Sequence, residues 1–274
     1  MYYAGPLRIL KNEMLSAEEA EVEARFAELV QTRLDALIAR YHARFGNVID
    51  TDRAREFCPD YCHSKASRTR FSRAVYQPAK ALADEIYRRS IQVAVVRRIL
   101  FTSGGTGAGK SSALAWLEAA LEPGDRAHIL VDGTLSDYAA SRAKIRQALA
   151  LGHSVSLVHV HRAFAETLRM VVARAIEMGR AVTLDNIAAT HCRSHETLFK
   201  LVAEFGGRIG VSVIENSAGH PSRAISLDEL ASRGVRSVDE LRQLAHTLLA
   251  NEFGSLKIEH PEIHEAFVQK GSRR

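Results

Sequence analysis

The sequence has few cysteines and no long apolar segment. Its 274 residues include only Cys58, Cys62 and Cys192, an odd number that is too small to crosslink a chain of this size. Disulfide-rich secreted scaffolds are therefore excluded, and a reducing compartment is expected. The most apolar run, Ile91 to Phe101, is interrupted by two arginines and is far too short to cross a bilayer. A membrane-spanning protein is excluded on the same ground.

The first residues give no sign of export. Residues 1–6 lack a positively charged segment followed by an apolar one, which a secretory signal requires. We therefore expect a cytoplasmic protein. Delivery into another cell by a specialised secretion machine would leave no signal that could be recognised in this sequence.

Charge and hydrophobicity are both moderate. Hydrophobic residues make up 46% of the chain and charged residues 25%, which is typical of globular proteins and excludes a disordered or fibrous chain. Lys and Arg number 37 against 32 Asp and Glu, so the net charge is +5. This excess is spread along the chain. It suits ligands that carry phosphate, and it does not require nucleic acid.

Strand-length apolar runs alternate with helical patterns in the centre of the chain. Strands that alternate with helices, and are apolar on both faces, indicate a parallel sheet covered by helices on both sides. The expected strands are 99–102, 128–131, 155–160 and 209–214, and the expected helices are 110–121, 137–151, 164–178 and 194–205.

Helical segments are expected on both sides of this centre. Residues 16–45 carry apolar side chains at helical spacing after a capping box at Ser16 and Glu19, and they predict one long helix. A brief strand is expected at 47–52 and a helix at 78–89. Capping boxes at Ser226/Glu229 and Ser237/Glu240, with His260-Pro261 before a last short helix, predict a helical tail.

One motif in the centre carries specific chemistry. Residues 104–111 satisfy G-x-x-x-x-G-K-[ST] between an expected strand and an expected helix. In such a loop, backbone N–H groups surround a triphosphate, Lys110 neutralises its β- and γ-phosphates, and the Ser111 hydroxyl coordinates Mg²⁺. ATP and Mg²⁺ are therefore the expected cofactors. The expected nucleotide-binding residues are Gly104, Gly105, Thr106, Gly107, Ala108, Gly109, Lys110, Ser111 and Ser112.

The motif and the alternating pattern together predict the fold class. It is α/β, a three-layer αβα P-loop NTPase or kinase core with a parallel sheet and helical additions at both ends. We divide the chain into an N-terminal helical extension (1–46), a P-loop core (47–217) and a C-terminal helical extension (218–274), all within one compact unit.

Acidic residues follow two of the expected strands. Asp132 ends an apolar strand soon after the loop, and it fits either the Walker-B acid that holds Mg²⁺ through water or a cap of the next helix. Asp50 and Asp52 point to the same side if their segment is extended, and would then form a second candidate site. The alternative for this pair is a cap at a strand-to-helix turn.

Three stretches of the sequence resemble the zeta toxin family of P-loop kinases. They lie roughly between Asn47 and Asn216. Members of this family are bacterial toxins, often neutralised by a small antitoxin, and they phosphorylate a hydroxyl of UDP-N-acetylglucosamine. The first stretch is 48–52 with Pro59 and Tyr61, and the second is the phosphate-binding loop with its helix. The third runs from 131–134 to 213–216 and includes Gly152-His153, the strand 155–160, Arg174 and Arg180.

The order of these stretches differs from that of the family. In typical zeta toxins the strand that bears the catalytic base follows the phosphate-loop helix, whereas Asn47 to Tyr61 precedes the loop here. The core would then be a circular permutation, which is tolerable because strand contacts, not chain order, fix the site. A competing alignment takes the Asp132 strand as the base strand. We prefer the permuted alignment because residues 132–134 resemble the family's later Glu-Gly-Thr step, and the number of residues from there to Gly152 also matches.

The resemblance implies catalytic roles for residues on both sides of the loop. Asp52 would orient or deprotonate the acceptor hydroxyl. Asp132 would hold the substrate or the metal shell, and Thr134 follows it as a substrate-binding residue. Arg174 and Arg180 would spread their guanidinium groups over the transferring phosphate as lid arginines, unless they are solvated charges at a helix end.

Other residues carry weaker signals. Arg73 lies in a basic cluster that either grips a substrate diphosphate or forms a solvated face. His161 and Arg162 fit ligand contacts or a capping role equally well, whereas a lone histidine such as His191 is more often a structural residue than a ligand contact. A zinc site at Cys58, Cys62 and His63 lacks a second ligand pair.

The leading hypothesis is a zeta-toxin-like, ATP-dependent kinase that transfers the γ-phosphate to a hydroxyl of a nucleotide-sugar such as UDP-N-acetylglucosamine. Its partners would be a nucleotide-like small molecule and an antitoxin or immunity protein, with no membrane. One alternative is a kinase of NAD or another nucleotide-like metabolite, because a virulence effector family with a zeta-like fold phosphorylates NAD. A nucleotide-gated ATPase or binding module is a second alternative. A nucleic-acid binder is the third, and the dispersed charge argues against it.

Overall fold

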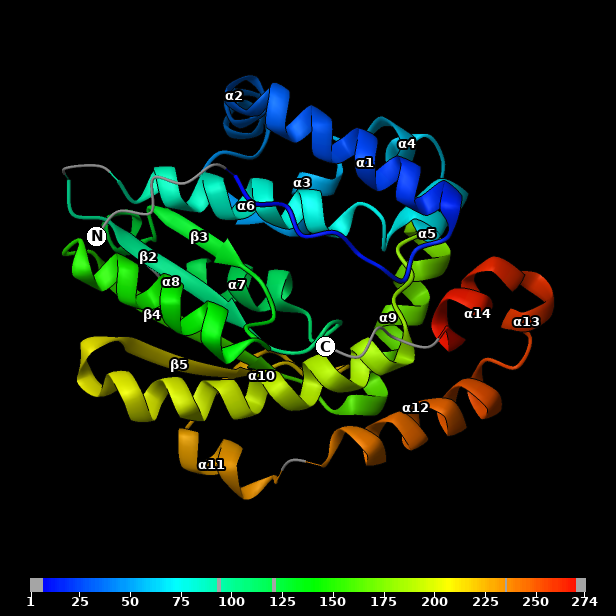
Figure 1. Cartoon of the computed structure of the whole chain (residues 1–274). Helices are drawn as coiled ribbons and strands as arrows, with labels where there is room; N and C mark the ends of the chain where they lie inside the picture. Colours follow the sequence, from blue (N-terminus) through cyan, green and yellow to red (C-terminus); the bar gives the residue numbers. More distant parts are fainter. Residues whose placement is uncertain (1–6, 93–94, 120–121, 235, 270–274) are drawn as a thin grey trace.

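A central sheet of mostly parallel strands organises the molecule (Figure 1). The computed structural model describes residues 7–92, 95–119, 122–234 and 236–269, and across these residues six strands form one sheet in the order β1-β3-β2-β4-β5-β6. All neighbouring pairs are parallel except β5 and β6, which are antiparallel. The strands are β1 (Val48–Asp50), β2 (Arg98–Ser103), β3 (Ile129–Asp132), β4 (Ser154–His161), β5 (Gly210–Glu215) and β6 (Arg223–Ile225).

Helices cover both faces of this sheet. Phe101 of β2 packs in the cluster of α6, α8 and α10, whereas its neighbour Leu100 packs against Leu114 of α7 on the opposite face. Successive side chains of a strand point to opposite faces, so a strand that is apolar at both positions must be covered twice. The predicted three-layer αβα fold is therefore confirmed. These helices are α6 (Tyr76–Ser90), α7 (Lys110–Ala119), α8 (Tyr138–Ala150) and α10 (Leu184–Phe205).

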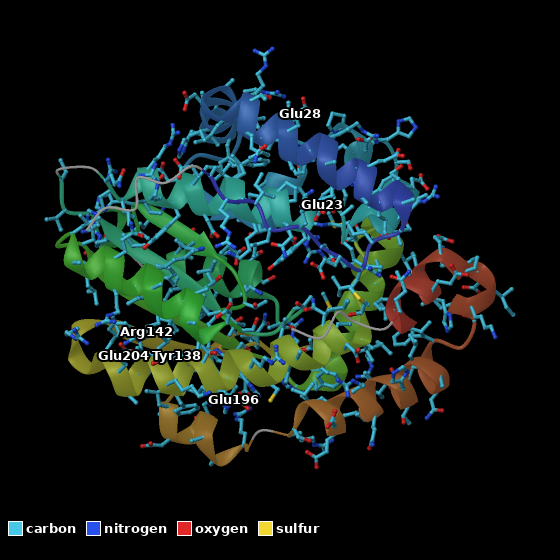
Figure 2. All side chains as sticks on the ribbon, viewed as in Figure 1. Glu23, Glu28, Tyr138, Arg142, Glu196 and Glu204 are labelled. Carbon is cyan, nitrogen blue, oxygen red and sulfur yellow. The ribbon has the colours of Figure 1, made fainter. Side chains whose placement is uncertain are left out.

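Polar contacts join α8 and α10 along the edge of their layer. Glu204 accepts a hydrogen bond from the Tyr138 hydroxyl at 2.6 Å and from Arg142 Nε at 2.7 Å. Figure 2 shows the three side chains converging between the two helices. They fix the spacing of the helices outside the apolar core.

The predicted long helix over 16–45 is two helices, α1 (Ala17–Thr32) and α2 (Leu34–Phe45). Arg33, with φ −123° and ψ 24°, ends the first and begins the second. The break lets Val22 and Phe26 of α1 and Tyr41 of α2 all reach the main core, although the two helices differ in direction. The capping box at Ser16 is present as predicted.

The segment after α2 differs from the expected strand over 47–52. Strand β1 ends at Asp50, and Asp52 lies in the first turn of the short helix α3 (Thr51–Arg55). Asp50 Oδ1 accepts a hydrogen bond from Asp52 N at 2.8 Å, so the strand-to-helix cap is the correct alternative and the extended segment was wrong. Two further short helices, α4 (Pro59–Cys62) and α5 (Lys65–Phe71), were not anticipated.

Helix α10 begins ten residues before its expected start at 194. Its first half packs with α9 and α12 in a second apolar cluster, through Leu184 and Ile187, while its second half packs on the sheet through Leu198 and Leu201. Because the two halves bury different faces, and polar residues are buried between them, the apolar spacing that marks a simple amphipathic helix is lost.

The C-terminal region is helical apart from the short strand β6, which the sequence did not indicate. The capping box at Ser237 begins α12 and His260 precedes the last helix, both as predicted. Ser226 caps α11, but the predicted capping box there is incomplete, because the Glu229 carboxylate pairs with Arg223 and Arg233. Helices α9, α12, α13 and α14 contribute to the second apolar cluster. The remaining elements are α9 (Phe164–Met178), α11 (Leu227–Ser232), α12 (Val238–Glu252), α13 (Leu256–Glu259), α14 (Pro261–Val268), and the 3-10 helices η1 (Pro123–Asp125) and η2 (Gly206–Arg208).

None of the helices in the described part of the chain combines the length and the apolar character needed to cross a membrane.

Candidate active site

The phosphate-binding loop joins β2 to α7 at the carboxyl edge of the sheet. The end of β5 supports it: Asn216 Nδ2 donates hydrogen bonds to the carbonyls of Ala108 and Gly109 at 3.2 and 3.0 Å. Gly109 has φ +82°, and a β-carbon there would lie 2.3 Å from that amide nitrogen, so only glycine fits. Four N–H groups in the first turn of an α-helix have no intrahelical acceptor, so the start of α7 can receive phosphate oxygens.

Lys110 lies across the inside of this loop. Its Nζ donates to the carbonyls of Gly104 and Gly105 at 3.4 and 3.5 Å, both long for a hydrogen bond. Burial lowers its pKa, although the carboxylates of Asp132 and Asp50 act in the opposite direction. An ammonium group with weak partners and poor solvation is well placed to bind an anionic ligand.

Asp132 ends β3, the strand next to the loop strand β2. The Thr102 hydroxyl donates to Asp132 Oδ1 at 2.6 Å and accepts from Gly133 N at 2.9 Å, so the carboxylate is held in one orientation. The Thr134 carbonyl accepts from Gly104 N at 3.2 Å. The turn after β3 is therefore attached directly to the start of the phosphate-binding loop.

Asp50 lies beside Asp132 because β1 pairs with β3 in that register. Burial, with the like charges of Asp52 and Asp132, raises the pKa of Asp50 to about 7. We call these three residues the acidic cluster. Such clustering of carboxylates is costly, and it is typical of sites that bind cations or move protons.

Asp52 is the member of the acidic cluster that contacts arginines. Arg180 Nη2 lies 2.8 Å from its Oδ2, Arg174 Nη2 lies 3.7 Å from the same oxygen, and Arg55 Nη1 lies 3.5 Å from Oδ1. Burial alone would raise the pKa of Asp52, but these cations together lower it below the usual value. Asp52 is therefore ionised at neutral pH.

The two predicted lid arginines reach Asp52 from the end of α9. Arg174 lies in the last turn but one of that helix, and Arg180 follows Gly179, which ends it in the left-handed conformation. The Arg180 side chain is 17% exposed, whereas that of Arg174 is 45% exposed. The loop itself lies under α9, because the backbone of Gly107 is close to Thr167 and Val171. The fold thus brings both arginines to the same edge as the loop.

The oxygen groups near the loop suit Mg²⁺. Ser111 lies in the first turn of α7 and Asp132 faces Lys110, and hydroxyl, carboxylate and phosphate oxygens are the ligands that this ion prefers. Among the described residues no group of three or more His, Cys, Asp or Glu side chains is arranged to hold a metal. A metal at this site would depend on the phosphates of a bound nucleotide for its other ligands.

Three other expected site residues are either exposed or have their partners elsewhere in the molecule. Ser111 and Ser112 are exposed at the start of α7. Arg73 hydrogen-bonds to the Met14 carbonyl and, at 3.2 Å, to Gln269 Oε1, so it connects the two ends of the chain. Its role in binding substrate stays a prediction.

The weaker candidates take structural positions. Arg162 is buried, and its Nε donates to the Asn216 carbonyl at 2.7 Å beside the loop. Cys58, Cys62 and Cys192 are free thiols, and burial raises the pKa of Cys58 to about 11.

Sequence reasoning missed Arg55 and Thr102. Arg55 is three residues after Asp52 on α3, and the i, i+3 spacing would have revealed it if the segment had been read as a helix. Thr102 precedes the loop on β2, and nothing in its local sequence marks it as the partner of Asp132, because that contact depends on the pairing of β2 with β3.

Comparisons with known proteins add little to this geometry. No protein-family model matches the chain, and no curated protein matches it by sequence. Among solved structures, the chain is similar to one from a study of the PezAT chromosomal toxin–antitoxin system of the human pathogen Streptococcus pneumoniae, at 13% identity and a TM-score of 0.37, over 89% of this chain and 100% of that one. A likeness this low carries no argument about activity, so the functional assignment rests on the site itself.

Proposed function

We propose that this protein is a zeta-toxin-like, ATP-dependent kinase that transfers the γ-phosphate to a hydroxyl group of a nucleotide-like small molecule. The observation that carries the proposal is the ion pair between Asp52 and Arg180, at 2.8 Å, at the same edge of the sheet as Lys110. Phosphoryl transfer to an alcohol needs a triphosphate cradle, a carboxylate at the acceptor and mobile cations. The chain supplies one of each.

The residues divide between the donor and the acceptor. Lys110 and the start of α7 bind the phosphates of ATP, and Asp132, oriented by Thr102, faces Lys110 on the donor side. Ser111 and Asp132 would hold Mg²⁺, which would supply positive charge to the transferring phosphate. We assign Asp52 to the acceptor side, because its ion pairs are with the arginines of α9 and α3, although Lys110 also lowers its pKa. This division supports Asp52, and not Asp132, as the residue that contacts the acceptor hydroxyl.

Transfer then follows from an exchange of partners. The acceptor hydroxyl donates a hydrogen bond to Asp52, which is ionised at neutral pH, and Arg180 and Arg174 turn from the carboxylate to the γ-phosphate. The hydroxyl oxygen attacks phosphorus, the bond to the β-γ bridging oxygen breaks, ADP leaves, and the hydroxyl proton passes to Asp52. The strand order also fits a circularly permuted core, because β1 precedes the loop in sequence yet lies beside β3 in the sheet.

The acceptor we propose first is UDP-N-acetylglucosamine, with NAD as the second choice, on the resemblance of residues 47–216 to zeta toxins. An antitoxin or immunity protein belongs to the same proposal. The test is mass spectrometry of small molecules after incubation with ATP, Mg²⁺, UDP-N-acetylglucosamine, other UDP-sugars and NAD. A new phosphorylated acceptor is expected. Formation of ADP and free phosphate with every acceptor unchanged would contradict the kinase and favour an ATPase.

Two variants test the division of roles. Asp52→Ala should lower acceptor phosphorylation by about 10²–10⁴-fold, the usual loss when a general base is removed. Asp125→Ala, at an exposed acidic residue of η1, is the matched control. If Asp52→Ala keeps full activity while Asp132→Ala abolishes it, the competing alignment is correct and Asp132 is the base.

A further inference from the structure

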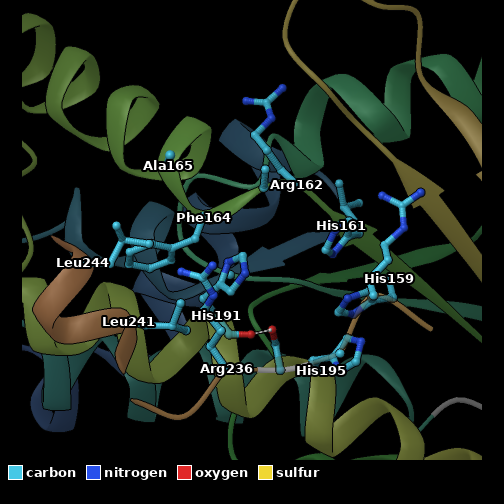
Figure 3. Close-up of a pocket in the computed structure, with 16 residues that line it drawn as sticks. His159, His161, Arg162, Phe164, Ala165, His191, His195, Arg236, Leu241 and Leu244 are labelled. Atoms are coloured by element: carbon cyan, nitrogen blue, oxygen red, sulfur yellow. Dashed lines mark hydrogen bonds between the residues drawn. The ribbon is translucent and has the colours of Figure 1, made fainter. Parts of the chain in front are cut away.

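A cavity lies beside the phosphate-binding loop, next to the end of β4. It has a volume of about 360 Å³ and is lined by the end of β4, the start of α9, the middle of α10, the start of α12, and Arg233, Gly234 and Arg236 (Figure 3). Gly105 of the loop forms part of its wall, and no member of the acidic cluster lines it. We call it the histidine cavity after His159, His161, His191 and His195, whose rings surround it.

The polar groups around this cavity are imidazoles and guanidinium groups. Burial lowers the pKa of both His161 and His191 to about 4, so these two rings are neutral at physiological pH. Arg162, Arg233 and Arg236 also line the cavity, and none of its described lining residues is a carboxylate. A cavity with cations and no acid on its wall favours an anion.

Of these groups, Arg236 is available to a ligand, whereas the unpaired nitrogen of His195 is not. His195 is 8% exposed, and its buried Nδ1 has no hydrogen-bond partner among the described residues. This atom is too buried to be reached from the cavity, and the ring interacts with the Leu230 backbone, so His195 contributes its ring surface to the wall. Arg236 makes no hydrogen bond or ion pair within the described ranges, although Glu240 lies near enough to feel its charge.

The other two arginines are already engaged. Arg233 forms ion pairs with Glu215 and Glu229, and Arg162 donates to the Asn216 carbonyl. Arg236, which is exposed and has Glu240 near it, is thus the cation available to a ligand. A single available cation favours a ligand of low charge.

Apolar side chains form the remaining wall. Phe164 begins α9, and Leu241 and Leu244 project from α12 into the lining of the cavity (Figure 3). The Phe164 and His191 rings meet edge to face with centroids 5.2 Å apart, which leaves flat surfaces for a planar group. Pockets of a few hundred Å³ with an apolar wall and a few polar groups are typical of sites for small organic molecules.

We propose that the histidine cavity is a binding site for a small organic anion with a planar apolar body, such as an aromatic carboxylate or an aryl phosphate. The anionic group lies against Arg236, and the body contacts Phe164, Leu241 and the rings of His191 and His195. The site is separate from the acidic cluster, and its occupant does not depend on the proposed kinase activity.

The test follows the histidine ring signals of the full chain by NMR after ¹⁵N labelling of histidine. The probes are benzoate and phenyl phosphate, each titrated to about 10 mM, a range that detects binding in the millimolar class. The controls are benzamide, which lacks the charge, and inorganic phosphate, which lacks the apolar body. Both anionic aromatic probes should shift the signals of His195 and His191, and at equal concentration both controls should shift them at least about tenfold less.

Arg236→Ala should weaken the binding of phenyl phosphate about tenfold, the loss expected for one charge-assisted contact. Arg193→Ala is the matched control, because Arg193 is an exposed arginine of α10 outside the cavity lining. Equal binding of inorganic phosphate would overturn the organic ligand in favour of a general anion site. The proposal also fails if neither aromatic anion shifts these signals, or if Arg236→Ala binds as tightly as the unchanged protein.

Discussion

The acidic cluster and the histidine cavity occupy the same edge of the sheet, on opposite sides of the loop strand β2. In the acidic cluster, Asp52 keeps its charge because Arg180 and two further arginines surround it. In the histidine cavity, His161 and His191 lose theirs, because burial outweighs the nearby Glu215 at His161 and meets no opposing carboxylate at His191. Burial of ionisable groups therefore has opposite results at the two places, and the presence of a partner decides which.

This difference in charge also determines which chemistry suits the acidic cluster and which suits the histidine cavity. Charged groups that hold one another in place can exchange partners when a charged substrate arrives, which suits phosphoryl transfer. Neutral rings around an open volume provide hydrogen bonds and flat surfaces, which suit binding without reaction. The following predictions test this contrast, from the largest expected effect to the smallest.

Lys110→Ala should lower phosphoryl transfer by about 10³-fold or more, because it removes the cation that binds the phosphates. The folded state should not be destabilised, since burial already disfavours this ammonium group. Initial rates and thermal unfolding provide the measurements, with Lys200→Ala, an exposed lysine of α10, as the control. If Lys110→Ala keeps full activity, neither Lys110 nor the acidic cluster beside it takes part in the reaction.

Arg180→Ala should lower the transfer rate by about 10²-fold, and Arg174→Ala by about tenfold. Arg180 is closer to Asp52, at 2.8 against 3.7 Å, and it is less exposed. The values of kcat for the two variants provide the comparison, and Arg193→Ala serves as the control. Equal and negligible losses would show that both arginines are only charges at a helix end.

Asp50→Asn should raise the free energy of unfolding above that of the unchanged chain at pH 8, and this gain should be smaller at pH 4. The pKa of Asp50 in the folded state is about 7, above that of an unfolded Asp, so its contribution to stability is lost as the pH rises through 7. The gain at pH 8 should be roughly 1–3 kcal/mol. The asparagine side-chain oxygen can accept the same hydrogen bond from Asp52 N, so loss of the helix cap does not contribute to the measured difference.

Denaturant unfolding at the two pH values measures this effect, with Asp137→Asn, an exposed N-cap of α8, as the control. An equal effect of Asp50→Asn at pH 4 and pH 8 would show that its carboxyl is not perturbed by its neighbours.

The histidine cavity should respond to pH in the opposite direction. His161 and His191 have folded-state pKa values of about 4, below the usual value of 6.5, so stability is lost as the pH falls from 6.5 towards 4. The double variant His161→Gln/His191→Gln should reduce the difference in unfolding free energy between pH 7 and pH 4.5 by about 1–2 kcal/mol. An unchanged difference would mean that these rings are not held neutral by burial.

Local sequence was sufficient for the loop and for most of the elements around it. The pattern G-x-x-x-x-G-K-[ST] predicted where the loop would lie, and helix 164–178 was predicted at its observed ends, because its apolar spacing and Gly179 are local signals. The predicted helix bounds were wrong where one segment packs against two different parts of the fold. Residues 16–45 bend at Arg33, and α10 changes the face that it buries partway along its length.

The acidic segment shows the limit most clearly. The residue pair Asp50 and Asp52 was identified, but its local structure was wrong, because three residues of strand and a turn of helix have no pattern of their own. The contact of Asp52 with Arg180 joins residues 128 positions apart and follows from the packing of α9 over the loop. No local signal carries such a pairing.

By itself, the sequence determined the phosphate-binding loop, the α/β class and the types of side chain available for chemistry, because these depend on residues close together in the chain. The tertiary structure alone decided that β1 lies beside β3, that Asp52 meets three cations and that four histidines surround a cavity. These features depend on which strands pair and which helices cover them. Strand pairing and layer packing are set by the burial of apolar surface over the whole chain, and that is a global quantity.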